Sequence, residues 1–503
     1  MKTRKNNKQF YGFIGICLAS FLGCIDFTIM NTALPNIQIN LNADITQLQW
    51  LINIFLLALT TFMVIQGRLA DIYGRKRFLY IGFFLFGISS LGAGLSANVN
   101  WLIFFRFLQG AGIAILYTMP IAIIPSLFTA DMRIRMTSIM VGVNGLGLAI
   151  GPVIGGLMIS ILSWRWIFFI NLPIILVSYA LCRRTVPESK NNHPTNSIDW
   201  PGFILLGISL PMFILATVKG PDWGWTSPLI LFLYIATLLC WITFYYIEQH
   251  SKSPLLQLTL FANREYICGV IANFISAFYY TVVFFILPLY LQNILGKSSD
   301  AIGLILLPCT AMVAIFSPIA GKVVDNFGHK ITLLFGFLLF MLSAYLQTWF
   351  SAHSHLGFII FSLVLFGIGW AFILGPSIVT ALSSLPESMS GIAIGSIGAL
   401  HNFGGATGLA IGTVLYHHQA QIMLIAENIK NQLPISSWVE EAVANPSAAI
   451  HIIIQATQLS FDNAYQLFSN FFIYSYVSLM WLLTIISLVG FVIVFVGLKL
   501  KKD

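Results

Sequence analysis

Two ionisable residues, Asp26 and Arg106, lie inside long apolar stretches of the sequence. A charged side chain at the centre of a membrane span costs about 2.5 kcal/mol or more, unless it is neutralised or paired. Burial favours a protonated carboxyl, whereas a nearby cation favours the carboxylate. Asp26, balanced between these effects, could bind and release a proton, with Arg106 as its counter-charge. The alternative is a purely structural ion pair.

The composition predicts that these stretches cross a membrane. Of the 503 residues, 58% are hydrophobic and only 8% are charged, and the mean hydropathy is +0.88. A soluble protein carries about 25% charged residues on its hydrated surface. Disordered, nucleic-acid-binding and secreted disulfide-rich proteins are therefore excluded. The six cysteines form no C-x-x-C pair, so we expect buried thiols and no metal site.

Hydropathy and charge together predict fourteen spans with both termini in the cytoplasm. Twenty Lys and Arg residues would then face inward and four outward, a strong positive-inside bias. The apolar segments lie at about 10–32, 48–67, 78–97, 101–125, 137–161, 165–182, 201–218, 228–247, 266–293, 301–320, 331–350, 356–378, 390–416 and 469–498.

An internal repeat predicts how the spans are grouped. The sequence GRLADIYG at 67–74 recurs as GKVVDNFG at 321–328, after the predicted second and tenth spans. Two six-span halves separated by two inserted spans would give this displacement of eight spans. We therefore expect an N-terminal half at 1–185, two inserted helices at 186–262 and a C-terminal half at 263–503. Parallel halves of this kind place a substrate site at their interface.

Ordered motifs make the chain resemble the major facilitator superfamily, and specifically its fourteen-span drug:proton antiporter family. The motifs are Asp26-x-Thr28-x-x-Asn31, Gly67-x-Leu69-Ala70-Asp71-x-x-Gly74-Arg75-Lys76, Arg106-x-x-Gln109-Gly110-x-Gly112 and Gly147-x-x-x-Gly151-Pro152-x-x-Gly155-Gly156. The resemblance covers about residues 20 to 415. It implies an all-α polytopic protein with the major facilitator fold, in which fourteen transmembrane helices include two inserted ones.

The resemblance implies roles for two of these motifs. The loop after the second span would latch the two halves in one access state, although its basic residues could instead serve only to set orientation. The predicted latch residues are Gly67, Asp71, Gly74, Arg75, Lys76, Asp325 and Gly328. In span 5, Gly147, Gly151, Gly155 and Gly156 would line one face for a tight contact between the halves, and Pro152 would bend the helix.

In transporters of this fold, the substrate cavity is lined mainly by the first and fourth helices of each half. The residues that the resemblance places near it, by their polar or aromatic character, are Asn31, Gln109, Asn144, Asn273, Tyr280, Trp370, His401 and Asn402. The family usually has an arginine where this chain has His401, which is either a titratable substrate contact or a satisfied core histidine.

We therefore expect proton-coupled efflux of hydrophobic or amphipathic small molecules such as drugs, by alternating access. The protein would be no enzyme and would use no cofactor, because the proton gradient drives it and no Walker sequence occurs. Its predicted partners are substrate, protons, the lipid of the cytoplasmic (inner) membrane, and an accessory periplasmic or outer-membrane export protein at the long external loop 417–468. The alternatives are a dedicated exporter of an endogenous metabolite, such as a siderophore or peptide-like compound, and a non-transporting membrane sensor.

Overall fold

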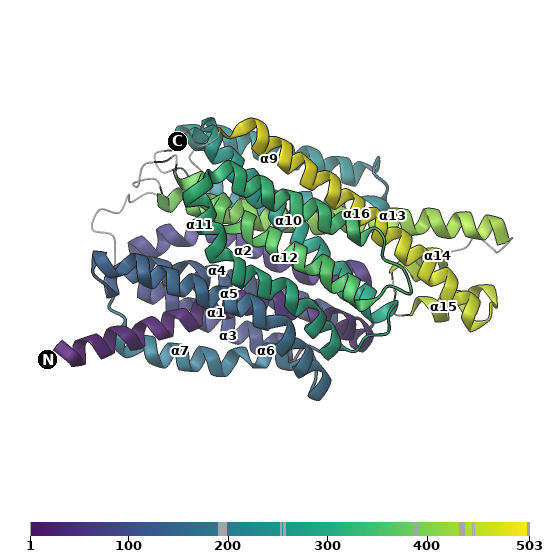
Figure 1. The fold of residues 1–503 in the computed structure, drawn as a ribbon, viewed down its shortest axis with the longest axis horizontal. Helices are drawn as coiled ribbons and strands as arrows, with labels where there is room; N and C mark the ends of the chain where they lie inside the picture. The colour runs from purple at the N-terminus through teal and green to yellow at the C-terminus, as the bar shows by residue number, and fades with distance from the viewer. Residues whose placement is uncertain are drawn as a thin grey trace.

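The chain is helical and contains no strand in the part that the computed structural model describes. That part comprises residues 2–189, 199–251, 254, 258–383, 385, 390–431, 438–444, 446 and 448–499. Long helices lie side by side in an elongated bundle (Figure 1). The prediction of an all-α protein is confirmed.

Seven helices from the first part of the chain form one group, here termed the first bundle. They are α1 (Lys2–Leu41), α2 (Ile45–Tyr73), α3 (Arg75–Gly94), α4 (Val99–Leu127), α5 (Ala130–Ile161), α6 (Trp166–Phe169) and α7 (Asn171–Thr185). A capping box begins α2: Asp44 Oδ1 accepts a hydrogen bond from the Gln47 amide, and Gln47 Oε1 accepts one from the Asp44 amide. α1 packs against α4, α5 and α7, and α4 packs against α2 and α3.

Five long helices form the second bundle. They are α10 (Arg264–Asn293), α11 (Ser299–Gln347), α12 (Leu356–Ser383), α13 (Ser390–Asn431) and α16 (Phe461–Gly497). α11 is two helical segments joined at Gly328, where φ is +81° and ψ is 170°. Glycine adopts this conformation without the steric cost that a Cβ atom brings. The break agrees with the two spans predicted on either side of it.

Shorter helices and a hairpin complete the fold. η1 (Leu258–Ala262) precedes α10, and α14 (Trp438–Ala444) and α15 (Ala449–Thr457) lie between α13 and α16. The predicted loop 417–468 is therefore largely helical where it is described, since α13 continues to Asn431 and α16 begins at Phe461. The predicted apolar segment ends at 416, but a helix needs no continuous apolar run to continue into water.

The hairpin of α8 (Trp200–Trp223) and α9 (Pro228–His250) touches both bundles. α8 contacts α2 through the rings of Phe203 and Phe62, whose centroids lie 5.9 Å apart. It contacts α13 through Phe213 and Phe403, at 6.0 Å. The inserted pair therefore lies beside the seam where α2 meets α13.

Eleven helices of the described chain are long and apolar enough to cross a membrane. The exposed side of α9 is rich in large apolar residues, including Phe232, Ile235, Leu239 and Ile242. A helix that is hydrophobic on its exposed side is typical of contact with lipid. The protein is therefore a multi-pass membrane protein.

The two bundles meet mainly along three helix pairs, α2 with α13, α5 with α11, and α1 with α10, and α1 also touches α11. The start of α1 and the end of α16 lie at one end of the molecule, termed the termini end (Figure 1). α14 and α15 lie at the opposite end, termed the cap end.

Candidate functional site

The centre of the first bundle contains a buried ion pair between α1 and α4. Arg106 Nη1 lies 2.7 Å from Asp26 Oδ2, and each side chain is 2% exposed. The structure thus brings together the two ionisable residues singled out in the sequence. Charge-assisted hydrogen bonds of this length are among the stronger ones in proteins.

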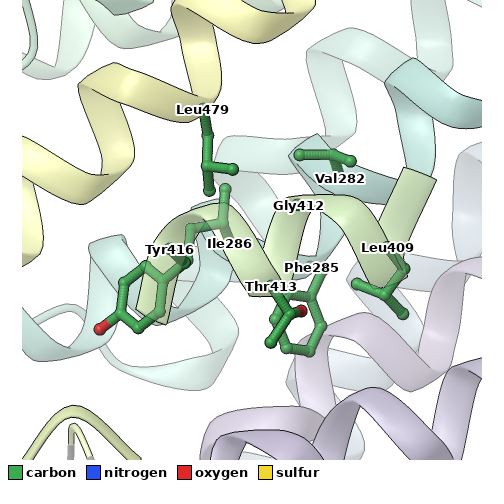
Figure 2. A pocket seen from close by; sticks show the side chains of 8 residues that line it. All are labelled: Val282, Phe285, Ile286, Leu409, Gly412, Thr413, Tyr416 and Leu479. Atoms are coloured by element: carbon green, nitrogen blue, oxygen red, sulfur yellow. The ribbon is translucent and has the colours of Figure 1, made fainter. Parts of the chain in front are cut away.

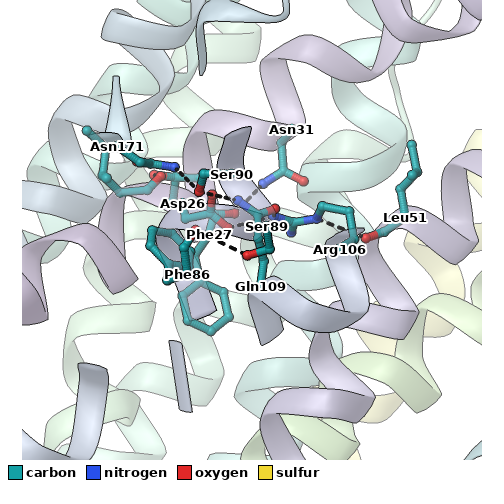
Figure 3. Close-up of polar contacts among 12 residues, drawn as sticks. Asp26, Phe27, Asn31, Leu51, Phe86, Ser89, Ser90, Arg106, Gln109 and Asn171 are labelled. Atoms are coloured by element: carbon teal, nitrogen blue, oxygen red, sulfur yellow. Dashed lines mark hydrogen bonds and ion pairs between the residues drawn. The ribbon is translucent and has the colours of Figure 1, made fainter. Parts of the chain in front are cut away.

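Further contacts hold the guanidinium of Arg106 in place (Figure 3). Its Nε donates to the Leu51 carbonyl oxygen at 3.3 Å, its Nη1 also donates to Gln109 Oε1 at 3.1 Å, and its Cζ lies 4.0 Å from the centre of the Phe55 ring. Gly110 lets α2 come close, because a Cβ atom there would collide with the Phe55 carbonyl oxygen. The spacing Arg-x-x-Gln-Gly therefore places two polar groups and one close helix contact on adjacent faces of α4.

The network extends to residues that the sequence did not single out. Gln109 Nε2 donates to Ser90 Oγ at 2.8 Å, and Asn171 Nδ2 donates to the same oxygen at 3.3 Å. Both Ser90 and Asn171 are buried. Each is a polar residue within an apolar segment, which is the signal that could have identified them. The ion pair therefore links α1 to α2, α3, α4 and α7.

The ion pair joins α1 to α4 through the charges of Asp26 and Arg106. α1 also packs against α5 in its own bundle and against α10 and α11 in the other. α1 therefore contacts the second bundle and also carries one member of the ion pair.

Three glycines of α5 pack against α1. Cβ atoms on Gly147, Gly151 and Gly155 would meet Cys24, Thr28 and Thr32 respectively. Steps of four residues keep these positions on one side of a helix. They permit close packing within the first bundle, not between the bundles.

Gly156 instead faces the second bundle. A Cβ atom there would lie 2.6 Å from the carbonyl oxygen of Ser299, and one on Gly303 would collide with the carbonyl of Pro152. The prediction that all four glycines line one inter-bundle face is therefore wrong. Residues 155 and 156 are one step of about 100° apart, so they face different helices.

The turn between α2 and α3 is held by contacts within the first part of the chain. Gly74 has a φ of +115°. Arg75 Nη1 donates to the Ala122 carbonyl oxygen at 3.0 Å, and Lys76 donates through its amide to Glu188 Oε1 at 3.0 Å. These contacts tie the turn to α4 and to the segment after α7.

The remaining residues of the predicted latch are placed only in part. Gly67 and Asp71 belong to the helical stretch of α2, but beyond this backbone they lie outside the described residues. In the second copy, Asp325 is exposed near the break at Gly328. Their role in joining the bundles stays a prediction.

Four of the predicted substrate residues meet in the second bundle. The Tyr280 ring stacks between Trp370, at 4.9 Å, and His401, at 5.8 Å. The Asn273 carbonyl oxygen lies 3.2 Å from His401 Nδ1, and Asn273 Nδ2 donates to Ser377 Oγ at 2.8 Å. α10, α12 and α13 thus build one aromatic group from residues far apart in sequence.

The other four predicted substrate residues lie elsewhere. Asn31 Nδ2 donates to the Phe27 carbonyl oxygen of its own helix, at 2.9 Å, and Gln109 belongs to the Arg106 network. Asn144 lies half-buried on α5. Asn402 Nδ2 donates to the Gly398 carbonyl oxygen at 2.9 Å and lies 3.9 Å from Met63 Sδ. Asn402 therefore lies at the seam between α2 and α13.

Neither of two cavities in the described chain is lined by the ion pair or the aromatic stack. One, among α10, α13 and α16, has a volume of about 10 Å³ (Figure 2), which is room for about one water molecule. The other is an apolar groove of about 520 Å³, lined mainly by α10 and α16, with Phe261 and Leu400 also in its wall. The first is too small to hold a drug-sized molecule.

Direct contacts close the cap end of the seam between the bundles. Asn36 Nδ2 donates to Ser299 Oγ at 2.6 Å, joining α1 to α11. Gln49 Nε2 donates to the Leu409 carbonyl oxygen at 3.3 Å, joining α2 to α13. Together with the close approach of α5 to α11, these bonds close the space between the two bundles at the cap end.

Comparisons with known proteins agree on one family. The Major Facilitator Superfamily matches residues 16–263 and 269–425. Multidrug resistance protein Stp of Mycobacterium tuberculosis is 32% identical over 414 residues, which cover 82% of this chain and 76% of that protein. The Tetracenomycin C resistance and export protein of Streptomyces glaucescens is 29% identical over 402 residues, covering 80% and 75%.

The solved structures agree on the fold. The crystal structure of a bacterial homolog to the human lysosomal transporter Spinster, in an inward-facing and occupied conformation, matches with a TM-score of 0.67. The two share 15% sequence identity, and the match covers 97% of this chain and 96% of that one. At this identity the likeness concerns the fold alone.

Proposed function

The chain belongs to the Major Facilitator Superfamily, and on this premise we propose that it exports hydrophobic or amphipathic small molecules, such as drugs, in exchange for protons. Relatives at 32% and 29% identity bear the names of a multidrug resistance protein and of a resistance and export protein. Alternating access between the two bundles would move the substrate. The proton gradient would drive the cycle without a cofactor.

The buried pair of Asp26 and Arg106 is the observation that carries this proposal. It supplies one carboxyl whose protonation would change a contact of α1, a helix that touches both bundles. One charge crossing a potential of 100 mV provides about 2.3 kcal/mol. That free energy supports roughly fifty-fold accumulation of a neutral substrate, since each 1.4 kcal/mol is worth a factor of ten.

We further propose fourteen crossings of the cytoplasmic membrane, with both termini in the cytoplasm. The eleven apolar helices give twelve crossings, because α11 is divided at Gly328 into two spans. α5 and α13 bring the number of crossings to fourteen. The division into 1–185, 186–262 and 263–503 follows from the repeat. The distribution of Lys and Arg supports the orientation.

The aromatic stack in the second bundle is the proposed substrate site. Tyr280, Trp370 and His401 present parallel rings, against which planar, weakly charged molecules could stack. Asn273 holds His401 through its carbonyl oxygen. An accessory export protein that binds near α14 and α15 stays a prediction.

The proton-coupling role can be tested in proteoliposomes with an imposed pH gradient. Asp26→Asn is expected to abolish gradient-driven efflux of a fluorescent amphipathic dye while the protein still inserts. Asp462→Asn, which changes an exposed acid at the start of α16, is the matched control and should retain efflux. Wild-type proton exchange in the Asp26→Asn variant would refute the role.

The alternatives make different predictions. A dedicated metabolite exporter would change the metabolites of the medium on deletion, without a change in drug susceptibility. A non-transporting sensor would release no protons when substrate is added to the purified protein.

A further inference from the structure

One face of α2 runs along the seam with α13. Gln49 touches Leu409 near the cap end, and Met63 touches Asn402 nearer the termini end. Between them, a Cβ atom on Gly405 of α13 would lie 3.3 Å from Leu56. Positions 49, 53, 56, 60 and 63 follow the helical steps of three and four residues, so Asn53 lies on this face as well.

The polar groups of this face near the cap end lack partners in the described chain. Gln49 and Asn53 are completely buried. Both amide atoms of Asn53 and the Oε1 of Gln49 have no hydrogen-bond partner there. Burial of such groups is unfavourable because nothing replaces the hydrogen bonds that water would make.

Two hydroxyls of the second bundle lie near this face. Thr413 Oγ1 is buried and has no partner among the described residues, and Thr413 lines the small cavity among α10, α13 and α16. Thr281 is buried as well, and its hydroxyl interacts with the Tyr280 side chain. Thr281 lies against the seam, since a Cβ atom on Gly405 would be 2.8 Å from its Oγ1. Thr413 is one helical turn beyond Leu409, the residue that accepts the hydrogen bond from Gln49.

Polar groups nearer the termini end of the same seam do have partners. Thr60 Oγ1 donates to the Leu56 carbonyl oxygen at 2.7 Å. Asn402 Nδ2 donates to the Gly398 carbonyl oxygen at 2.9 Å. Gln49 and Asn53, the two amides of this face with unsatisfied atoms, therefore lie towards the closed end of α2, where apolar side chains would pack with less cost.

We propose that Gln49, Asn53, Thr281 and Thr413 form a polar exit track, which becomes hydrated and contacts the departing substrate when the cap end opens. Opening gives the unpaired atoms of Gln49, Asn53 and Thr413 the hydrogen bonds that they lack in the closed seam. The track therefore favours the open state, and its side chains also line the exit path. This inference rests on the proposed export function.

The chemistry of the track indicates what it would bind. Its side chains are two amides and two hydroxyls, without charge. Such groups pair with carbonyl, hydroxyl and amide groups of an uncharged amphipathic molecule. The track would follow the aromatic stack on the way out, because Thr281 is the neighbour of Tyr280 on α10.

The opening can be measured without substrate. Spin labels at two exposed cap-end positions, Asn40 of α1 and His418 of α13, report the distance between the bundles in a variant otherwise without cysteine. Asn53→Leu is expected to lower the ratio of open to closed molecules on the order of tenfold. An unchanged ratio overturns the proposal.

A pair of isosteric substitutions controls for general effects on folding. Thr413→Val removes a hydroxyl without a partner, and Thr60→Val removes one that is bonded within its own helix. Thr413→Val should lower the open fraction at least threefold more than Thr60→Val. Equal effects of the two substitutions would show that the hydroxyls of the track have no special role.

Substrate contact is tested by export from proteoliposomes. Asn53→Leu should slow the export of chloramphenicol, an uncharged amide with two hydroxyls, more than that of Nile red, which has no hydrogen-bond donor. Equal slowing of both overturns the contact with substrate. If the wild-type protein exports neither probe under a pH gradient, the proposed function fails, and the spin-label ratio still decides whether the track opens the seam.

Discussion

A double-mutant cycle on the buried ion pair gives the sharpest test of its energetics. Leucine replaces Asp26, Arg106 or both. At 2.7 Å and an effective dielectric constant of about 20, the attraction between the charges is about 6 kcal/mol. Desolvation opposes this attraction with several kcal/mol for each ion.

The single variants should be much less stable than the double variant. Removal of one partner leaves an uncompensated buried charge, which costs about 3–5 kcal/mol. Asp26→Leu should lie near 3 kcal/mol, because Gln109, Leu51 and Phe55 still contact the guanidinium. The double variant should approach the stability of the wild type, because both charges are gone.

The free energies can be measured by SDS-induced unfolding in mixed micelles, followed by tryptophan fluorescence. The expected coupling energy between the two positions is at least about 3 kcal/mol. Additive losses in the double variant would refute the reasoning. The same variant separates stability from function: it should be folded but unable to exchange protons for substrate, and retained exchange would leave the pair a purely structural one.

Three further substitutions test the close contacts. Gly156→Val should lower the thermal unfolding midpoint in detergent and loosen the cap end, since over-packing costs about 1–3 kcal/mol. The control is Gly375→Val, because a Cβ atom on Gly375 meets nothing within 4 Å. Equal midpoints for the two variants would contradict the close packing at Gly156. Gly74→Ala should cost about 1–3 kcal/mol of unfolding free energy, because φ there is +115° and a Cβ atom would lie 2.6 Å from Glu188 Oε1. A stability equal to the wild type would show that the turn relaxes. Ser299→Ala removes the 2.6 Å bond from Asn36 and should raise the open fraction about fivefold, from a loss of about 1 kcal/mol; an unchanged spin-label distance distribution would contradict this.

Local chemistry explains why much of the architecture could be predicted. A membrane span and its orientation depend only on nearby residues and on the bilayer, so apolar runs and the distribution of Lys and Arg predict them. The glycines at the turns, Gly74 and Gly328, likewise act locally. The break of α11 at Gly328 therefore agrees with the predicted pair of spans. The extension of α13 to Asn431 was not predicted, because hydropathy reports the limits of the membrane and not those of a helix.

The sequence by itself determined that this is a multi-span membrane protein of one superfamily, and that Asp26 and Arg106 are ionisable residues within its apolar spans. Only the tertiary structure decided their partners. Gly155 and Gly156 are adjacent in sequence but touch different bundles, and Tyr280 stacks between rings about 90 and 120 residues away. The physical reason is that a sequence pattern specifies which face of a helix is small, polar or apolar, whereas the packing of whole helices decides what that face meets.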